Sequence, residues 1–530
     1  MTTHPVATAI DEGRTTLGIE LGSTTIKAVL IGPDRRPIAH GSQSWENEFV
    51  DRTWTYSLDA VRTGLRSCVA RLREDVRARH GATLSQVGAL GVSAMMHGYL
   101  AFDEEGELLT PFRTWRNTAT GEAAEVLSRH LGQNIPHRWS VAHYFQAILN
   151  QEPHVSHVHR LTTLAGYVHH ELTGEWILGI GDASGMFPVD AATLDYDEGM
   201  LRRFDRLAAE HGVTTPLRTL LPEVRVAGAT AGHLTPAGVR FLDPDGHLEP
   251  GAPTCPPEGD AGTGMVATNA VAPRTGNVSA GTSIFAMVVL EGPLSGPHPE
   301  IDLVTTPAGD PVGMVHCNNG ASELDAWADV FGQFAHALGH EVEESTVFST
   351  LFRASLEADA DAGGLTAFNN LAGEPITGLP EGRPLVLRRP GSELTLANFM
   401  RAQLFGAFAT LRLGMDVLMK EGVRIDRLFA HGGLFATPGV AQGYLAAALG
   451  TPVLVGEVAS RGGPWGMALL ADFTLRGQGR SLTDHLQAEV FSGSDLQRAE
   501  PDAETAAGFE EFLQRYRDAL PVQRAAVDHT

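Results

Sequence analysis

Two stretches of the sequence repeat one pattern, and this repeat constrains the fold more than any other feature. Residues 20–29 read as the end of a strand, a small polar turn and a returning strand, and residues 279–288 repeat that order. The turns consist of Gly22, Ser23 and Thr24 in the first copy and of Gly281, Thr282 and Ser283 in the second. Both turns lie between runs too apolar for surface hairpins, which favours a duplicated architecture over two unrelated hairpins.

Strands and helices alternate on either side of each copy. Apolar runs typical of buried strands fall at 17–21, 26–31, 87–93, 427–430 and 451–455. A helical period of apolar residues begins near Ser57 and ends near residue 79, and further helices are expected at 396–419, 438–449 and 464–475. The alternation predicts α/β layers, arranged as two similar halves around a central cleft.

Length and charge narrow the function classes. A chain of 530 residues exceeds the size at which a single core stops growing, so we expect more than one domain. The formal net charge of −24 disfavours nucleic-acid or anionic-membrane binding, because both reward basic surfaces. The three cysteines are far apart, and no apolar run approaches the ~20 residues of a membrane span. We therefore expect a soluble cytoplasmic protein with no nucleic-acid or membrane partner.

The two polar turns can bind an anion through backbone N–H groups and hydroxyls, and together they could clamp a triphosphate. The only lysines, Lys27 and Lys420, do not follow a glycine, so the sequence has no Walker A loop. Glu20, directly before the first turn, could hold Mg²⁺ directly or through water. A third turn, at Gly432 and Gly433, would let an adenine ring lie against bare backbone.

Asp260 is the candidate catalytic residue. It follows Gly259 and precedes Gly262 and Gly264, so backbone or ligand can approach it closely. A carboxylate held in such a segment can serve as a general base. The alternative is that Asp260 only caps a following helix, since Asp is a favoured N-cap residue.

Taken together, these segments resemble the FGGY carbohydrate kinases, a family of the actin, Hsp70 and hexokinase superfamily. The resemblance runs from about residue 14 to 475 in the family's order, through its two phosphate motifs, its catalytic segment and its adenosine motif. It implies two ribonuclease-H-like domains of the actin-like ATPase fold around a central cleft. The implied boundaries are 14–265 for an N-terminal domain, 266–490 for a C-terminal domain and 491–530 for a helical tail.

The resemblance also implies ATP and Mg²⁺ as cofactors and a role for individual residues. Asp260 would be the base and, with Glu20, would bind the metal. Met96 and His97 match the sugar-contacting Met-His-Gly of the family's xylulokinases, and Arg116 lies in the segment next to the implied sugar pocket. The implied nucleotide contacts are Gly22, Ser23, Thr24, Gly281, Thr282, Ser283, Gly432, Gly433 and Gln442.

Three positions depart from the family pattern. Glu20 stands where the first phosphate motif usually has Asp, and Ala261 replaces the Asn that usually follows the base. Arg116 lies in the segment that is usually Trp-Asn-Asp. The metal geometry and the way the sugar is held are therefore expected to differ in detail.

Other readings of the same residues are weaker. Gly262 to Ala267 fits a dinucleotide-binding signature, but Pro256 and Pro257 precede it where a buried strand is required. A nucleotide switch of the Hsp70 or actin type would share the hairpins but lack a sugar pocket, which Met96 and His97 count against. The expected function is therefore ATP-dependent phosphorylation of a small ketose, D-xylulose first, by a monomer or homodimer. Ribulose, erythritol and glycerol are the alternative substrates.

Overall fold

The computed structural model describes residues 5–456, 462–477, 479–493 and 496–530. The chain forms two compact units that are discontinuous in sequence. Unit 1 comprises Met1–Val271, Asp302–Val312 and Arg461–Gly493, and unit 2 comprises Ala272–Ile301, Gly313–Ser460 and Ser494–Thr530. The contiguous boundaries at 265 and 490 stay a prediction of domain organisation. Each unit is described by itself below.

Unit 1 is built on a sheet that begins with the first polar hairpin. Its strands follow the order β13 (Glu258–Gly259), β6 (Ala89–Ala94), β1 (Thr16–Leu21), β2 (Thr25–Ile31) and β3 (Pro37–Ser44). β1 pairs antiparallel with β2 and parallel with β6, and β13 continues the parallel side. The strands predicted at 17–21, 26–31 and 87–93 are thereby confirmed. Because β13 directly precedes Asp260, the sheet places the candidate base at the end of a parallel strand.

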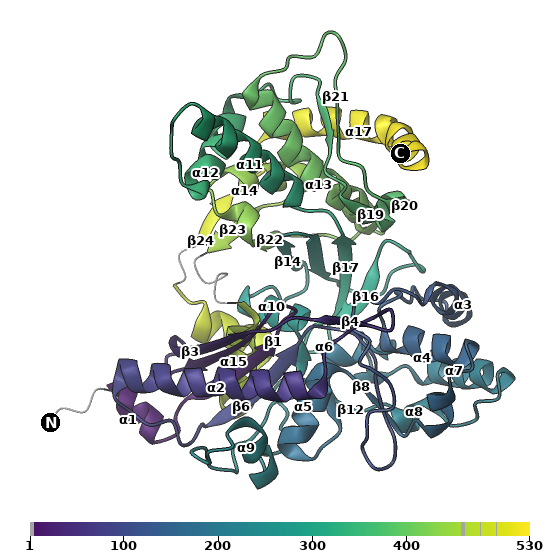
Figure 1. The fold of residues 1–530 in the computed structure, drawn as a ribbon, viewed down its shortest axis with the longest axis vertical. Coiled ribbons are helices and arrows are strands. Elements are labelled where there is room, and N and C mark those ends of the chain that lie inside the picture. The colour runs from purple at the N-terminus through teal and green to yellow at the C-terminus, as the bar shows by residue number, and fades with distance from the viewer. Residues whose placement is uncertain (1–4, 457–461, 478, 494–495) are drawn as a thin grey trace. The chain divides into compact units, whose positions relative to one another are not determined.

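Helix α2 (Leu58–His80) covers one face of this sheet (Figure 1). The Ser57 hydroxyl caps it by accepting a hydrogen bond of 3.1 Å from the Ala60 amide, as the sequence predicted. Its apolar stripe, from Val61 to Val76, is buried against the strands in one core. Helices α10 (Asp260–Ala267) and α15 (Gly462–Arg476) also pack against β1 or β6.

The remaining elements of unit 1 are short. They are α1 (Pro5–Asp11), β4 (Glu48–Val50), β5 (Thr53–Thr55), β7 (Leu100–Phe102), α3 (Gly121–Leu131), α4 (Ser140–Leu149), η1 (Pro153–His157), β8 (Arg160–Thr162), α5 (Leu164–Thr173), β9 (Ile177–Gly179), α6 (Ile180–Ala183), β10 (Val189–Asp190), β11 (Asp195–Tyr196), α7 (Glu198–Glu210), α8 (Leu217–Leu220), β12 (Glu223–Arg225), α9 (Pro236–Leu242), β16 (Asp302–Thr305), α16 (Leu482–His485) and η6 (Leu486–Val490).

Unit 2 repeats the strand arrangement of unit 1. Its sheet has the order β17 (Pro311–Cys317), β15 (Ile284–Val289), β14 (Thr275–Ala280), β22 (Arg427–His431), β23 (Val453–Gly456) and β24 (Leu496–Ala499). β14 pairs antiparallel with its hairpin partner β15 and parallel with β22, as β1 does with β2 and β6. The predicted duplication is therefore confirmed at the level of strand order and direction.

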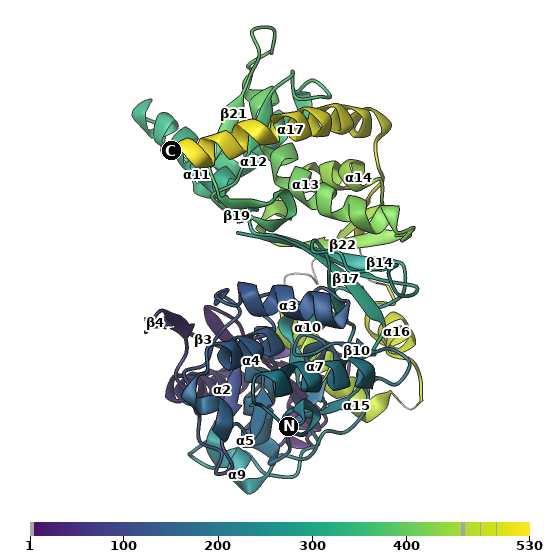
Figure 2. The ribbon, with the colours of Figure 1, turned by 90° about the vertical axis from the view of Figure 1, so that its right-hand side faces the viewer.

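The helices of unit 2 include α13 (Leu396–Lys420), α14 (Val440–Leu449) and α17 (Ala503–His529), which lie against one another (Figure 2). The other elements are α11 (Ser322–Ala337), α12 (Glu344–Ala354), η2 (Ser355–Glu357), β18 (Thr366–Phe368), β19 (Ala372–Glu374), η3 (Pro375–Thr377), β20 (Leu379–Glu381), β21 (Leu385–Leu387) and η4 (Gly433–Phe435). Across the described parts of both units, none of the helices combines the length and the apolar character needed to cross a membrane.

Candidate active site

Asp260 is the first residue of helix α10, and it does not cap that helix. The N-cap residue is Gly259, which has no side chain to cap with. The Asp260 carboxylate instead accepts a hydrogen bond of 3.0 Å from the Met96 amide, at the end of β6. Burial raises the pKa of Asp260, while hydrogen bonds from the Met96 and Ala261 amides lower it. The structure thus joins the candidate base to the Met-His-Gly segment by a direct hydrogen bond.

Glu20 lies on β1, where it pairs with Lys27 across the hairpin. Burial, and next the Asp260 carboxylate, raise the pKa of Glu20 to about 8, and Lys27 lowers it. One Glu20 oxygen lies so close to Gly463 at the start of α15 that a Cβ there would overlap it. Within the described part of the chain, no Lys, Arg or His nitrogen lies within 4.0 Å of the Glu20 or Asp260 carboxylate.

This pair of carboxylates fits a divalent cation. Burial, and then the Asp260 charge, raise the pKa of Glu20, and burial raises that of Asp260, so a bound cation would favour the ionised form of both carboxylates. The Thr263 hydroxyl lies beside the same glycine as Glu20 and adds an oxygen donor. Carboxylate and hydroxyl oxygens are the ligands that Mg²⁺ prefers.

His97 follows β6 in a strained backbone conformation with φ of 71°. Its ring is buried, stacks on Trp139 with centroids 6.3 Å apart, and places Nδ1 3.3 Å from the Gly185 carbonyl oxygen. A Cβ on Gly185 would come within 2.6 Å of that nitrogen. The segment from Gly179 to Gly185 therefore fixes the orientation of the histidine.

Two further acids are buried here, Asp182 within this segment and Glu258 bound to it, and the sequence did not single out either as a site residue. Asp182 accepts a 2.6 Å hydrogen bond from the Thr163 hydroxyl, and burial, opposed by that bond, raises its pKa to about 7, with Asp260 adding to the rise. Burial, and then Asp182, raise the pKa of Glu258 well above its ordinary range. The available signal was the acid two positions before Asp260, in a segment otherwise made of Pro and Gly.

Aromatic side chains hold the first hairpin turn. The Trp45 indole donates to the Gly22 carbonyl oxygen at 2.7 Å, and the Tyr56 hydroxyl donates to the Ser23 carbonyl oxygen at 2.5 Å. The Trp115 indole donates to the Ser23 hydroxyl at 3.2 Å. Thr24 is exposed at the tip. Sequence reasoning missed these aromatics, because the contacts join positions 23 to 92 residues apart.

Arg116 is exposed, and its guanidinium lies over the Trp54 ring, 4.3 Å from the centroid. Its neighbour Trp115 contacts Ser23. Burial raises the pKa of Tyr56, and the charge of Arg116 opposes that rise. The structure therefore places Arg116 beside the first hairpin.

In unit 2, the second hairpin turn is closed by the segment before α11. The Gly281 amide donates to the Ser283 carbonyl oxygen at 2.9 Å. The Gly320 and Ala321 amides donate to the Thr282 and Gly281 carbonyl oxygens, each at 2.8 Å. Gly281 and Thr282 are exposed, so their outward groups are open to a ligand.

The third turn packs on the base of this hairpin. Gly432 has a φ of 108°, and a Cβ there would overlap the Ala280 carbonyl oxygen, so only glycine fits. Gly433 faces open space. Gln442 is buried, and its amide donates to the Val453 and Gln497 carbonyl oxygens at 2.9 and 2.7 Å. The predicted contact of Gln442 with a nucleotide would therefore have to come from its carbonyl oxygen.

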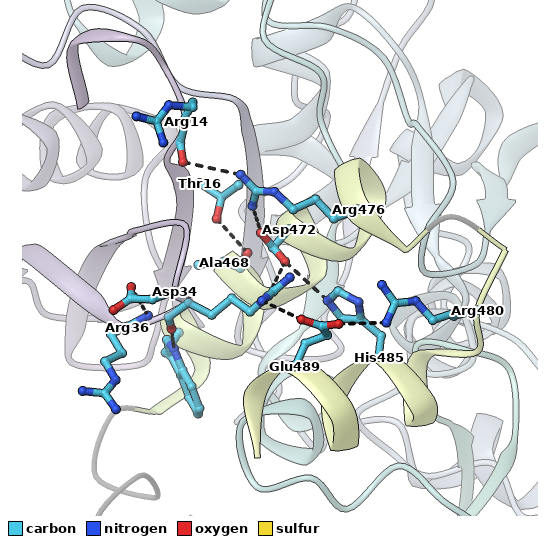
Figure 3. A network of polar contacts seen from close by, with 12 residues as sticks. Arg14, Thr16, Asp34, Arg36, Ala468, Asp472, Arg476, Arg480, His485 and Glu489 are labelled. Carbon is cyan, nitrogen blue, oxygen red and sulfur yellow. Dashed lines mark hydrogen bonds and ion pairs between the residues drawn. The ribbon is translucent and has the colours of Figure 1, made fainter. Parts of the chain in front are cut away.

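Helix α15, which carries Gly463 against Glu20, is anchored by a buried charge network (Figure 3). Asp472 is fully buried and accepts hydrogen bonds from Arg476 and, at 3.0 Å, from Arg35 on the turn after β2. His485 lies 3.3 Å from the same carboxylate. Glu489 accepts from Arg35 at 3.1 Å and completes the network.

Of the sequence-predicted residues, unit 1 therefore brings Asp260 next to Met96 and its neighbour His97, through the hydrogen bond from the Met96 amide. It also brings Asp260 close enough to Glu20 for the two carboxylates to interact. The first turn and Arg116 share the aromatic cluster. Unit 2 brings the second turn and Gly432 into direct contact.

Solved structures of carbohydrate kinases share this fold over nearly the whole chain. A ligand-bound xylulose kinase from Lactobacillus acidophilus matches with a TM-score of 0.79 and 16% identity, covering 97% of this chain and 99% of that one. A xylulose kinase from Rhodospirillum rubrum matches with a TM-score of 0.78 and 17% identity, covering 97% and 100%. The two α/β units thus define a protein of the actin-like ATPase fold.

Two family models match the sequence, the N-terminal domain of the FGGY family of carbohydrate kinases over residues 15–241 and its C-terminal domain over residues 276–475. The chain belongs to the FGGY family of carbohydrate kinases. The xylulose kinase of Haemophilus influenzae is 22% identical over 362 residues, 66% of this chain and 68% of that protein. The Escherichia coli xylulose kinase is 23% identical over 301 residues, 53% of this chain and 55% of that protein. The chain is therefore a xylulokinase-like carbohydrate kinase, and as a sugar kinase of this family it uses ATP, which implies a divalent cation.

Proposed function

We propose that the protein transfers the γ-phosphate of ATP to a hydroxyl of a small ketose, with D-xylulose as the first candidate. The observation that carries this proposal is the hydrogen bond from the Met96 amide to the Asp260 carboxylate, which joins an acid to the neighbouring His97. A sugar bound at His97 would present a hydroxyl to Asp260. The xylulose kinases among the relatives favour a pentulose over a hexulose or a polyol.

Asp260 accepts the proton of the attacking hydroxyl in this proposal. Its raised pKa makes it a stronger base than an exposed carboxylate, and the Met96 amide keeps one of its oxygens in place. Met96 and His97 orient the sugar. Arg116, held over Trp54 beside the first turn, adds a positive charge near the substrate.

ATP is held by backbone groups rather than by a lysine. The turns at Gly22–Thr24 and Gly281–Ser283 offer amides and hydroxyls to phosphate oxygens, and Gly432 and Gly433 offer bare backbone to the adenine. Glu20 and Asp260 would hold Mg²⁺, which supplies positive charge to the phosphates when bound. Positioning and electrostatics of this kind account for most of the rate of phosphoryl transfer.

A coupled ADP-release assay tests the proposal with D-xylulose, D- and L-ribulose, D-fructose, erythritol, glycerol and gluconate. D-Xylulose should give the highest kcat/KM. A polyol or an aldonate with a kcat/KM at least about tenfold above every ketose would overturn the ketose assignment, and ADP release with no acceptor dependence would overturn kinase activity. The monomeric or homodimeric state and the cytoplasmic location stay predictions. Size-exclusion chromatography with light scattering checks the oligomeric state.

A further inference from the structure

Among the described residues, each unit contains one fully buried glutamate whose carboxylate binds backbone amides, and the proposed mechanism uses neither. Glu258 in unit 1 is 1% exposed and Glu374 in unit 2 is 0% exposed. Buried glutamates are rare unless their oxygens are satisfied, because burial of an unpaired carboxylate is costly. The amides that bind these two carboxylates belong to the segment beside the sugar motif and to the segment beside the second phosphate turn.

Glu258 is bound to the start of α6. One of its oxygens accepts a 3.3 Å hydrogen bond from the Gly181 amide, and the other accepts a 3.0 Å bond from the Asp182 amide. A Cβ on Gly179 or Gly181 would overlap the carboxylate, so both glycines leave room for it. The chain is shaped locally to receive this side chain.

The same segment continues to the sugar motif. Four residues after Gly181, the Gly185 carbonyl oxygen meets Nδ1 of His97, and there is no space for a Cβ between them. Displacement of α6 would therefore move the surface on which His97 rests. Glu258 thus acts on His97 through one short piece of backbone.

Glu374 has the corresponding place in unit 2. Its Oε2 accepts hydrogen bonds of 3.0 Å from the Asn318 amide and 3.1 Å from the Asn319 side chain. The next residues, Gly320 and Ala321, donate their amides to the second phosphate turn. Glu374 therefore acts on that turn as Glu258 acts on His97. In both cases a stretch of two to four residues connects the amide that binds the glutamate to the group that contacts the site.

We propose that Glu258 and Glu374 are positioning residues with separate targets, Glu258 for the sugar-binding His97 and Glu374 for the phosphate-binding turn at Gly281–Ser283. The assignment of targets rests on the proposed function. The two glutamates are matched controls for each other, because both are buried and both bind backbone amides. A role in folding alone predicts the same kinetic effect for both.

The test substitutes each residue in the full-length enzyme. Glu258→Gln keeps the size of the side chain but has one acceptor oxygen for two amides, so the α6 segment should shift. The expected result is a KM for the sugar raised roughly 10-fold with the KM for ATP within about two-fold of the wild type. Glu374→Leu removes the oxygen that binds both Asn318 and Asn319, so it should raise the KM for ATP by a similar factor and leave that for the sugar unchanged. The exposed glutamates Glu198 and Glu381, changed to Gln, should alter neither constant.

Equal changes in both KM values for either buried variant, or no change in a folded protein, would overturn the proposal. Calorimetric titration with a non-hydrolysable ATP analogue provides a readout without turnover, in which only Glu374→Leu should bind more weakly. If the wild type phosphorylates no sugar, the proposed function fails, while this titration still decides the role of Glu374.

Two milder variants keep the test decisive if a buried substitution prevents folding. Gly185→Ala pushes on His97 from the other end of the segment, since its Cβ would lie 2.6 Å from Nδ1, and should raise only the KM for the sugar. Asn318→Ala removes an exposed side chain that donates to the Gly373 carbonyl oxygen at 2.8 Å, and should raise only the KM for ATP. The opposite pattern in either variant would contradict the proposal.

Discussion

Asp260→Asn should remove most of the activity while it preserves the structure of the site. The amide keeps an oxygen in the position of Oδ1, so the 3.0 Å hydrogen bond from the Met96 amide is retained. What the variant loses is the ability to accept a proton. A positioned general base contributes roughly 10²–10⁴-fold to a rate, so kcat should fall by that factor, equivalent to about 3–5 kcal/mol in the activation barrier.

The same substitution should not weaken the fold. Burial, and then the charge of Asp260, raise the pKa of Glu20 to about 8, and Asp260 also contributes to the raised pKa of Asp182. A neutral side chain at position 260 removes that repulsion, so the melting temperature should stay equal or rise. Stability lost in proportion to activity would show that Asp260 has a structural role.

The assay measures ADP release with the best sugar of the panel, together with calorimetric binding of sugar and of a non-hydrolysable ATP analogue. Asp59→Asn is the control, because the Asp59 side chain is 88% exposed on α2. It should have wild-type kinetics. A kcat of the Asp260 variant within about threefold of the wild type, with both ligands bound normally, would refute the assignment of Asp260 as the base.

Gly432→Ala should destabilise unit 2 by about 2 kcal/mol or more and weaken nucleotide binding, because φ is 108° and the new Cβ would overlap Ala280. Urea denaturation measures the loss of stability. The control is Gly433→Ala, which should unfold like the wild type because Gly433 faces open space. Asp472→Asn should cost roughly 3–5 kcal/mol in the same measurement, because it leaves two partly buried arginines without their buried carboxylate, and a loss below 1 kcal/mol would count against the network. Burial lowers the pKa of His485 to about 4 from an ordinary value of 6.5, so the unfolded chain binds a proton that the native one does not, and stability should fall as the pH drops from 6.5 to 4. The difference between wild-type and His485→Gln stability curves isolates this contribution, and parallel curves would contradict it.

Most of the secondary structure follows from local signals in the sequence. The paired hairpins, the strand before His97 and the cap at Ser57 all depend on turn chemistry and on the period of apolar residues, which act over a few positions. The duplication was visible for the same reason, because two copies of one hairpin carry the same short pattern. Asp260 was recognised from its neighbouring glycines.

Only the tertiary structure decided which residues support the site. Glu258 binds the backbone at Asp182, about 75 positions earlier in the chain, in the segment that contacts His97. A single buried acid leaves no periodic pattern in the sequence, so neither residue could be recognised from it. The indole of Trp115 reaches Ser23 from 92 positions away, which no local rule predicts. Helix α15 returns to unit 1 after the chain has built most of unit 2. The sequence by itself determined the two hairpin turns and the glycine-rich segment around Asp260, because turn chemistry is local. The residues that hold these segments in place were decided by burial and charge between distant parts of the chain.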